Sequence, residues 1–148
     1  MSLTLRPAAG ADWEAIAALL DQHGLPLAGA RDHMTDFLVA VQDARVVGVA
    51  GLERYGDTAL LRSVAVSSPG GGLGTRLVRA LLEHAHQSGV DNVVLLTTTA
   101  AAFFPRFGFT VVTREDVPAA VHASAEFQGA CPASATVMRL VLRREELT

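Results

Sequence analysis

The sequence contains no lysine and a single cysteine, and only 5% of its residues are aromatic. All 12 basic residues are therefore arginine, and against 15 acidic residues they leave a net charge of −3. One cysteine excludes an internal disulfide and any zinc site built from several cysteines. A mildly acidic chain without basic runs is not expected to bind nucleic acid or a membrane surface.

Long apolar runs are also absent, because none approaches the roughly 18 residues that a membrane-spanning helix needs. The N-terminal segment lacks the order of charged, apolar and small residues that marks a signal peptide. What is present is a chain of 148 residues, half of them hydrophobic, which is enough to form a sizeable core. We therefore expect one domain over residues 1–148, located in the cytoplasm.

The first part of the chain contains one helical pattern and several strand patterns. An apolar periodicity from Trp13 to Leu20, closed by Gly24, predicts a helix. Turn signals at residues 43–44 and 56–57 separate three apolar runs, which predicts an antiparallel meander. The strands expected in this part cover residues 3–6, 37–42, 45–54 and 58–66.

The second part begins with a glycine-rich loop and an amphipathic helix. Apolar residues recur every four positions from Leu73 to Ala85, and Gly89 ends the helix that they predict. Further expected elements are strands at residues 92–97, 109–112 and 135–142 and helices at 99–106 and 117–128. A meander followed by a βαβ crossover and a C-terminal strand predicts an α/β fold with a mixed (α+β) sheet.

Four glycines, Gly70, Gly71, Gly72 and Gly74, stand between a predicted strand and a predicted helix. Free N–H groups and the positive end of the helix dipole make such a place a phosphate site. A P-loop would need a lysine here, and a dinucleotide-binding fold would place the loop after its first strand. The residues thus leave two alternatives, an anion-binding loop, which we favour, and a flexible surface turn.

The loop belongs to a longer pattern, Arg-Ser-Val-Ala-Val at residues 62–66 followed by Gly-Gly-Gly-Leu-Gly at 70–74. Phe-Phe-Pro-Arg-Phe-Gly-Phe follows at residues 103–109. Together these segments resemble motif A and a downstream element of the GNAT N-acetyltransferases. The resemblance implies the GNAT-like acyl-CoA N-acyltransferase fold, acetyl-CoA as co-substrate, a small-molecule amine as acceptor, and a homodimer.

The same resemblance assigns acetyl-CoA contacts to a strand end, the loop, a helix start and two later segments. The residues so implied are Val64, Ala65, Val66, Gly70, Gly71, Gly72, Leu73, Gly74, Thr75, Arg76, Thr98, Phe103 and Phe104. A backbone N–H within residues 64–66 would stabilise the oxyanion. Arg76 and Arg79 are the cations expected nearest to the CoA phosphates.

Three shorter segments carry a narrower resemblance: Gly-Leu-Glu at residues 51–53, Leu-Leu-Thr-Thr-Thr at 95–99, and Glu-Phe at 126–127 with Cys-Pro-Ala-Ser-Ala at 131–135. They are similar to small GNAT proteins of arsenic-resistance operons, which are similar in turn to amino-acid acetyltransferases of the N-acetylglutamate synthase type. The implied acceptor is an amino acid or an analogue, including arsenic- or phosphorus-containing ones. The implied reaction is direct attack in a ternary complex.

Two positions depart from the family pattern. Pro69 stands where the family has Arg or Gln, so one contact of the phosphate loop is lost. Phe104 replaces a tyrosine that serves the family as general acid, and a phenylalanine cannot donate a proton. Water or Tyr55 would then protonate the leaving thiolate, or the protein is impaired. The alternative function is therefore a non-catalytic CoA-binding or ligand-sensing module.

Glu53 and Arg62 are the charged candidates for chemistry. Glu53 ends an apolar run, where burial would raise its pKa and suit a catalytic base; alternatively it is the polar end of a strand. The alternation of side chains along a strand predicts that Arg62 lies on the same face as Val64 and Val66. It either binds a substrate carboxylate or pairs with an acidic residue such as Glu53 or Glu126.

The resemblance also implies that the pantetheine arm passes and the acceptor enters at residues 97–99, where the threonine hydroxyls could bind either. Thr97 is the remaining substrate-binding residue predicted on this basis. The alternative for this segment is that Thr98 or Thr99 caps the next helix. The five histidines lack metal-ligand spacing, so no metal is expected.

Overall fold

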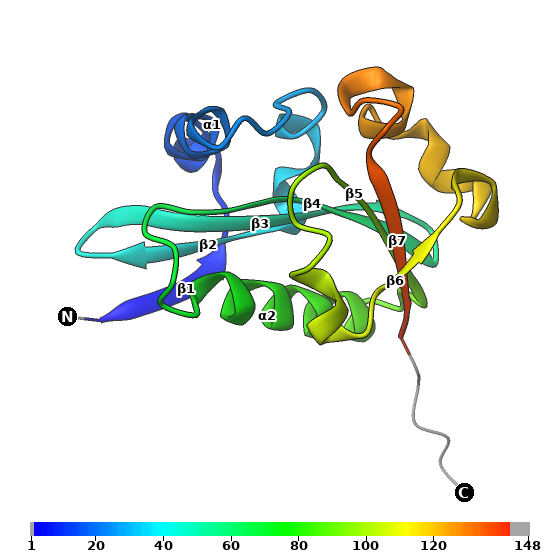
Figure 1. Ribbon diagram of the computed structural model, residues 1–148. Coiled ribbons are helices and arrows are strands. Elements are labelled where there is room, and N and C mark those ends of the chain that lie inside the picture. Colours follow the sequence, from blue (N-terminus) through cyan, green and yellow to red (C-terminus); the bar gives the residue numbers. More distant parts are fainter. Residues whose placement is uncertain (1, 143–148) are drawn as a thin grey trace, which may run out of the picture.

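A computed structural model describes residues 2–142 of the chain. Its centre is a seven-stranded sheet in the order β1-β2-β3-β4-β5-β7-β6 (Figure 1). The strands are β1 (Leu3–Pro7), β2 (Phe37–Gln42), β3 (Arg45–Tyr55), β4 (Thr58–Val66), β5 (Asn92–Thr97), β6 (Thr110–Val112) and β7 (Thr136–Val141). The strands expected from the sequence are thus present, with ends that differ by at most one residue.

The pairing of the strands follows the expected topology. Strands β1 to β4 form an antiparallel meander, and residues 43 and 44 both have positive φ in the hairpin turn between β2 and β3. Strand β5 is parallel to β4, and helix α2 (Leu73–Gln87) makes the crossover between them. Strand β7 is antiparallel to both β5 and β6. The predicted mixed α/β fold is therefore confirmed.

The two long helices cover opposite faces of the sheet (Figure 1). Leu77 and Leu81 of α2 are buried in a core on one face. Ile16 of α1 (Trp13–Gln22) packs with Phe37 in a core on the other face. Among the described residues, no helix combines the length and the apolar character that crossing a bilayer requires.

Several short helical turns connect these elements, and three of them stand where the sequence predicted two longer helices. The turns are η1 (Gly10–Asp12), η2 (Arg31–Asp36), η3 (Phe104–Phe107), η4 (Arg114–Asp116), η5 (Ala119–Ala123) and η6 (Glu126–Ala130). The expected helix at 99–106 is reduced to η3, and the expected helix at 117–128 is divided into η5 and η6. There, Ser124 is extended, and its hydroxyl accepts a hydrogen bond of 3.1 Å from the amide of Glu126. Such a local bond competes with a continuous helix.

Candidate functional site

The site begins where β4 and β5 separate. Their parallel register covers three residue pairs and ends at Leu60 and Val94, although both strands continue beyond this point. Two cavities lie along the opening, and both are lined by Val64, Ala100 and Phe104. The cavities therefore adjoin between the separated strands.

A bulge at Ser63 shapes the β4 side of this opening. Ser63 has a left-handed φ of +62°, and β4 carries one residue more than β3 at the register shift. The extra residue inverts the alternation, so Val64 and Val66 pack on the α2 face while Arg62 contacts the opposite side. The prediction that these three side chains share one face is therefore wrong. A left-handed non-glycine residue costs roughly 1–2 kcal/mol.

The first cavity, which we name the donor cavity, has a volume of about 540 Å³ and lies beside the glycine loop. Gly70 and Gly72 have φ of +98° and +79°, and an added Cβ would meet no atom within 4 Å at either position. The lining includes ten predicted cofactor residues: Val64, Ala65, Val66, Gly70, Gly72, Leu73, Gly74, Thr75, Phe103 and Phe104. Of the other predicted cofactor residues, all described, Thr98 lines the neighbouring cavity, whereas Gly71 and Arg76 line neither.

Arg106 is a lining residue of the donor cavity that the sequence prediction missed. Its guanidinium lies 4.4 Å from the ring centre of Phe103, and its Nε donates a 2.8 Å hydrogen bond to the Phe103 carbonyl. Arg79, which was expected near the phosphates, instead lies over the Phe107 ring. The available signal was the position of Arg106 within the aromatic element after β5.

The second cavity, which we name the acceptor cavity, has a volume of about 240 Å³. Strands β4 and β5 line one side, together with residues 98–100 and Phe104, and residues 23–26, Glu126 and residues 130–132 line the rest. Thr97 and Thr98 are both in this lining. The Thr97 hydroxyl accepts a 2.9 Å hydrogen bond from the amide of Ala100, so Thr97 is bonded to the segment that follows β5.

Arg62 is buried at the edge of the acceptor cavity between two carboxylates. Its Nη1 lies 2.6 Å from Oε2 of Glu53, and its Nε lies 3.2 Å from Oε2 of Glu126. It also donates to the carbonyls of Pro26 and Ala28 at 2.9 and 2.8 Å. The geometry favours the alternative in which Arg62 forms ion pairs with both acidic residues named from the sequence.

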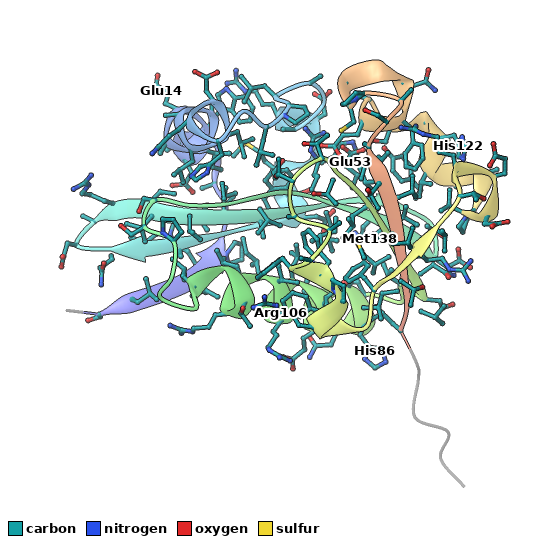
Figure 2. All side chains as sticks on the ribbon, viewed as in Figure 1. Glu14, Glu53, His86, Arg106, His122 and Met138 are labelled. Atoms are coloured by element: carbon teal, nitrogen blue, oxygen red, sulfur yellow. The ribbon has the colours of Figure 1, made fainter. Side chains whose placement is uncertain are left out.

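Glu53 is buried on the face of the sheet away from α2, with only 1% of its side chain exposed (Figure 2). Oε1 accepts a 2.5 Å hydrogen bond from the Tyr55 hydroxyl and lies 3.7 Å from Nε2 of His33. The pKa of Tyr55 is raised to about 12, chiefly by burial and secondly by the hydrogen bond to Glu53. Glu53 is thus a buried, paired carboxylate near the end of β3, and its role as a base stays a prediction.

Glu126 is the second carboxylate of this cluster, and it lines the acceptor cavity directly. Only 5% of its side chain is exposed. Burial raises the pKa of Glu126, and the Arg62 charge and a hydrogen bond with Cys131 oppose that rise. Burial and the nearby Glu126 charge raise the pKa of Cys131 to about 12, so its thiol stays protonated at neutral pH. Within residues 2–142, no three His, Cys, Asp or Glu side chains converge as metal ligands would.

The fold and the site together define a class of protein. A glycine-rich helix start beside two separated parallel strands is a binding site for an anion such as a phosphate group. The chain belongs to the GNAT acetyltransferases, because residues 33–111 match the model of the acetyltransferase (GNAT) domain.

Curated relatives carry the name of an amino-acid acetyltransferase. The protein of that name from Neisseria meningitidis is 27% identical, over 78% of this chain and 29% of the relative. The chain therefore spans less than a third of the length of the curated relatives that it matches.

Solved structures agree with the fold. N-acetylglutamate synthase from Neisseria gonorrhoeae, complexed with coenzyme A and N-acetyl-glutamate, has a TM-score of 0.82 and 23% identity over 97% of this chain and 36% of its own. A Mycobacterium tuberculosis protein in complex with CoA and the ligand NLQ has a TM-score of 0.78. It is 26% identical, and the match covers 95% of this chain and 99% of that one.

Proposed function

We propose that this chain transfers an acetyl group from acetyl-CoA to the amine of a small molecule by direct attack in a ternary complex. One observation carries the proposal: the donor and acceptor cavities adjoin at Val64, Ala100 and Phe104, between the separated ends of β4 and β5. A thioester extended from the donor side and an amine on the acceptor side would meet there. Holding both reactants at such a junction is the main requirement of direct transfer.

The donor cavity has the chemistry that a CoA pyrophosphate requires. Amide groups at the start of α2, beside Gly70 and Gly72, present hydrogen-bond donors and the positive end of the helix dipole. Arg106 adds a cation to the lining. This arrangement needs no lysine, so the negative net charge of the chain does not oppose it. Acetyl-CoA supplies the activated acetyl group when it is bound.

The end of β4 would stabilise the oxyanion that forms during attack. Beyond Leu60, the edge of β4 that faces β5 is no longer paired with that strand. The bulge at Ser63 reorients the backbone next to Val64. Backbone N–H groups fixed in this way cost no reorganisation when charge develops. The Tyr55 hydroxyl donates a hydrogen bond to Glu53, and its pKa of about 12 makes it a poor acid. Water is therefore the proton donor that we propose for the leaving thiolate.

The acceptor that we propose is an amino acid or an amino-acid analogue, with arsenic- and phosphorus-containing analogues included. Support comes from the names of the curated relatives and from the small volume of the acceptor cavity, about 240 Å³. Phe104 and Pro69 favour the second candidate, a CoA-binding or ligand-sensing module without turnover, since neither supplies the group that the family pattern has there.

A thiol-release assay tests both candidates. Acetyl-CoA is incubated with the protein and a panel of amino acids together with their phosphinic and arsenic analogues, and free CoA thiol is measured. Amine-dependent release supports the transferase. Binding of CoA in calorimetry without release for any amine would favour the sensing module, and absence of CoA binding at millimolar concentration would overturn both.

A further inference from the structure

The charges around the acceptor cavity do not favour a carboxylate at Arg62. Glu53 and Glu126 contribute two negative charges against the permanent positive charge of Arg62. His33 lies beside Glu53, with Nε2 3.7 Å from Oε1, and adds a positive charge only when it is protonated. The guanidinium also donates to the Ser63 hydroxyl and to the carbonyls of Pro26 and Ala28. A cluster with excess negative charge attracts a cation, and the cation that an acetyl acceptor brings is its ammonium group.

The two carboxylates differ in what they face. Both oxygens of Glu53 are bonded within the protein, one to the Tyr55 hydroxyl and one to Arg62. Glu126 is also buried, yet it is part of the lining of the acceptor cavity together with Thr97 and Thr98. An acceptor in this cavity therefore meets Glu126, whereas Glu53 acts through the guanidinium of Arg62.

Resting on the proposed function, we propose that Glu126 binds the acceptor ammonium and is the general base of the acetyl transfer. Glu53 is then a positioning residue that, through Arg62, fixes the segment with Pro26 and Ala28 at the cavity wall. This assignment replaces Glu53 by Glu126 as the base. Burial raises the pKa of Glu126, which makes its carboxylate a stronger base than that of a solvated glutamate.

The proposed step balances in protons and electrons. Glu126 accepts one proton from the ammonium, and the nitrogen lone pair then attacks the thioester carbonyl to form the new C–N bond. Collapse of the tetrahedral intermediate breaks the C–S bond, and the sulfur leaves with the electron pair. Water protonates the thiolate, the hydroxide so formed takes the second proton from the nitrogen, and Glu126 returns its proton to solvent. The net products are the acetamide, CoA thiol and one proton.

Several charged or titratable groups face Glu126 and enter its pH dependence. Arg62 on β4 stabilises the ionised carboxylate, Glu53 on β3 opposes it, and Cys131 after η6 donates a hydrogen bond to it. His23, at the end of α1, lines the same cavity and bonds the carbonyl of Val66 at 2.9 Å. A pH profile must therefore be compared between variants that change one of these groups at a time.

The test compares Glu126→Gln and Glu53→Gln, with Glu14→Gln on the exposed side of α1 as the matched control. The acceptor is the most active amine of the thiol-release panel, and kcat and KM are measured from pH 6 to pH 10. For Glu126→Gln we expect kcat at neutral pH to fall by about 10²–10⁴-fold. Activity of this variant should then keep rising with pH toward the pKa of the free amine, whereas wild-type activity levels off earlier.

Three further results separate a base from a structural residue. CoA affinity measured by calorimetry stays unchanged in Glu126→Gln, and Glu126→Asp recovers part of kcat because it restores a carboxylate. Glu53→Gln keeps the shape of the wild-type pH profile. The assignment is overturned if Glu126→Gln keeps the wild-type pH profile of activity, or if Glu53→Gln is the variant whose activity no longer levels off. Either result leaves the proposed transferase function standing. Absence of wild-type turnover would overturn the proposed function and this assignment with it.

Discussion

Nη1 of Arg62 lies 2.6 Å from Oε2 of Glu53, and the two side chains are 0% and 1% exposed. The guanidinium thereby joins β3 and β4, and through Glu126 it also joins η6. Its bonds to two backbone carbonyls tie the segment between α1 and η2 to the same point. The wall of the acceptor cavity is therefore held by one buried cation.

We expect Arg62→Leu to lower the free energy of unfolding by about 3–5 kcal/mol, because it leaves buried carboxylates without their partner. Urea unfolding at pH 7 measures the change. Arg54→Leu is the control. Arg54 is 42% exposed in its ion pair with Asp36, and such an exposed pair should contribute less than about 1 kcal/mol to stability. Equal losses in the two variants would contradict the role given to Arg62.

Gly51→Ala should destabilise the protein by about 1–3 kcal/mol, because overpacking forces buried groups apart. A Cβ at this position would lie 2.2 Å from the ring of Phe37, which is fully buried. Gly10→Ala is the control, since its Cβ would meet no atom within 4 Å. Thermal unfolding of Gly51→Ala with and without Phe37→Leu checks the cause, because only a steric clash is relieved by the smaller side chain.

The order of strands and long helices follows from local sequence patterns, whereas the breaks in that order do not. Alternating and four-residue periodicities locate the seven strands, α1 and α2 because each element buries one face. The helix expected at 117–128 fails because the Ser124 hydroxyl bonds the Glu126 amide. The prediction of which sheet face Val64 packs on is wrong because the bulge at Ser63 arises from the pairing of β4 with β3.

The donor side of the site is more readable from the sequence than the acceptor side. Clustered glycines at a helix start have a direct physical meaning, and most of the residues implied by the resemblance line the donor cavity. The only sequence signal for Arg106 is its position in the aromatic element after β5, and Glu126 becomes visible as a lining residue only in the folded chain. Glu126 meets Arg62 across 64 positions of sequence, and no local pattern encodes that contact.

Arg106→Ala should weaken CoA binding by roughly three- to tenfold, or about 1 kcal/mol, because it removes a cation from the donor cavity. The loss should shrink as salt is raised, since salt screens exposed charges. Calorimetry with CoA at two salt concentrations measures both effects. Arg45→Ala, on an exposed part of β3, is the control. A larger effect of Arg76→Ala would instead support the cation assigned from the family resemblance.

Glu126 and Asp12 should affect stability with opposite dependence on pH. Burial raises the folded pKa of Glu126, so its ionisation destabilises the fold as pH rises above about 4.3, the usual value for Glu. Glu126→Gln should therefore gain stability relative to the wild type as pH rises from 4 to 7.

For Asp12 the sign is reversed. The hydrogen bond from Arg6 lowers its pKa, so its stabilisation is present at neutral pH and is lost as pH falls through the folded pKa. Asp12→Asn should therefore be less stable than the wild type at pH 7 and approach it in acid. Urea unfolding from pH 4 to pH 7 tests Glu126→Gln, and urea unfolding from pH 7 to well below the usual Asp value of about 3.9 tests Asp12→Asn. A stability deficit of Glu126→Gln that grows toward pH 7 would show that its ion pair with Arg62 outweighs its burial.

Phe104→Tyr should raise kcat by up to roughly tenfold at neutral pH, because it supplies a general acid where the family pattern has one. Phe104 is 6% exposed and lines both cavities at their junction. A hydroxyl there would be near the departing thiolate, while the ring keeps its edge-on contact with Phe103. Steady-state thiol release measures kcat, and Phe109→Tyr, outside both cavity linings among the described residues, controls for the added hydroxyl. An unchanged kcat with unchanged CoA affinity would show that protonation of the thiolate does not limit the reaction.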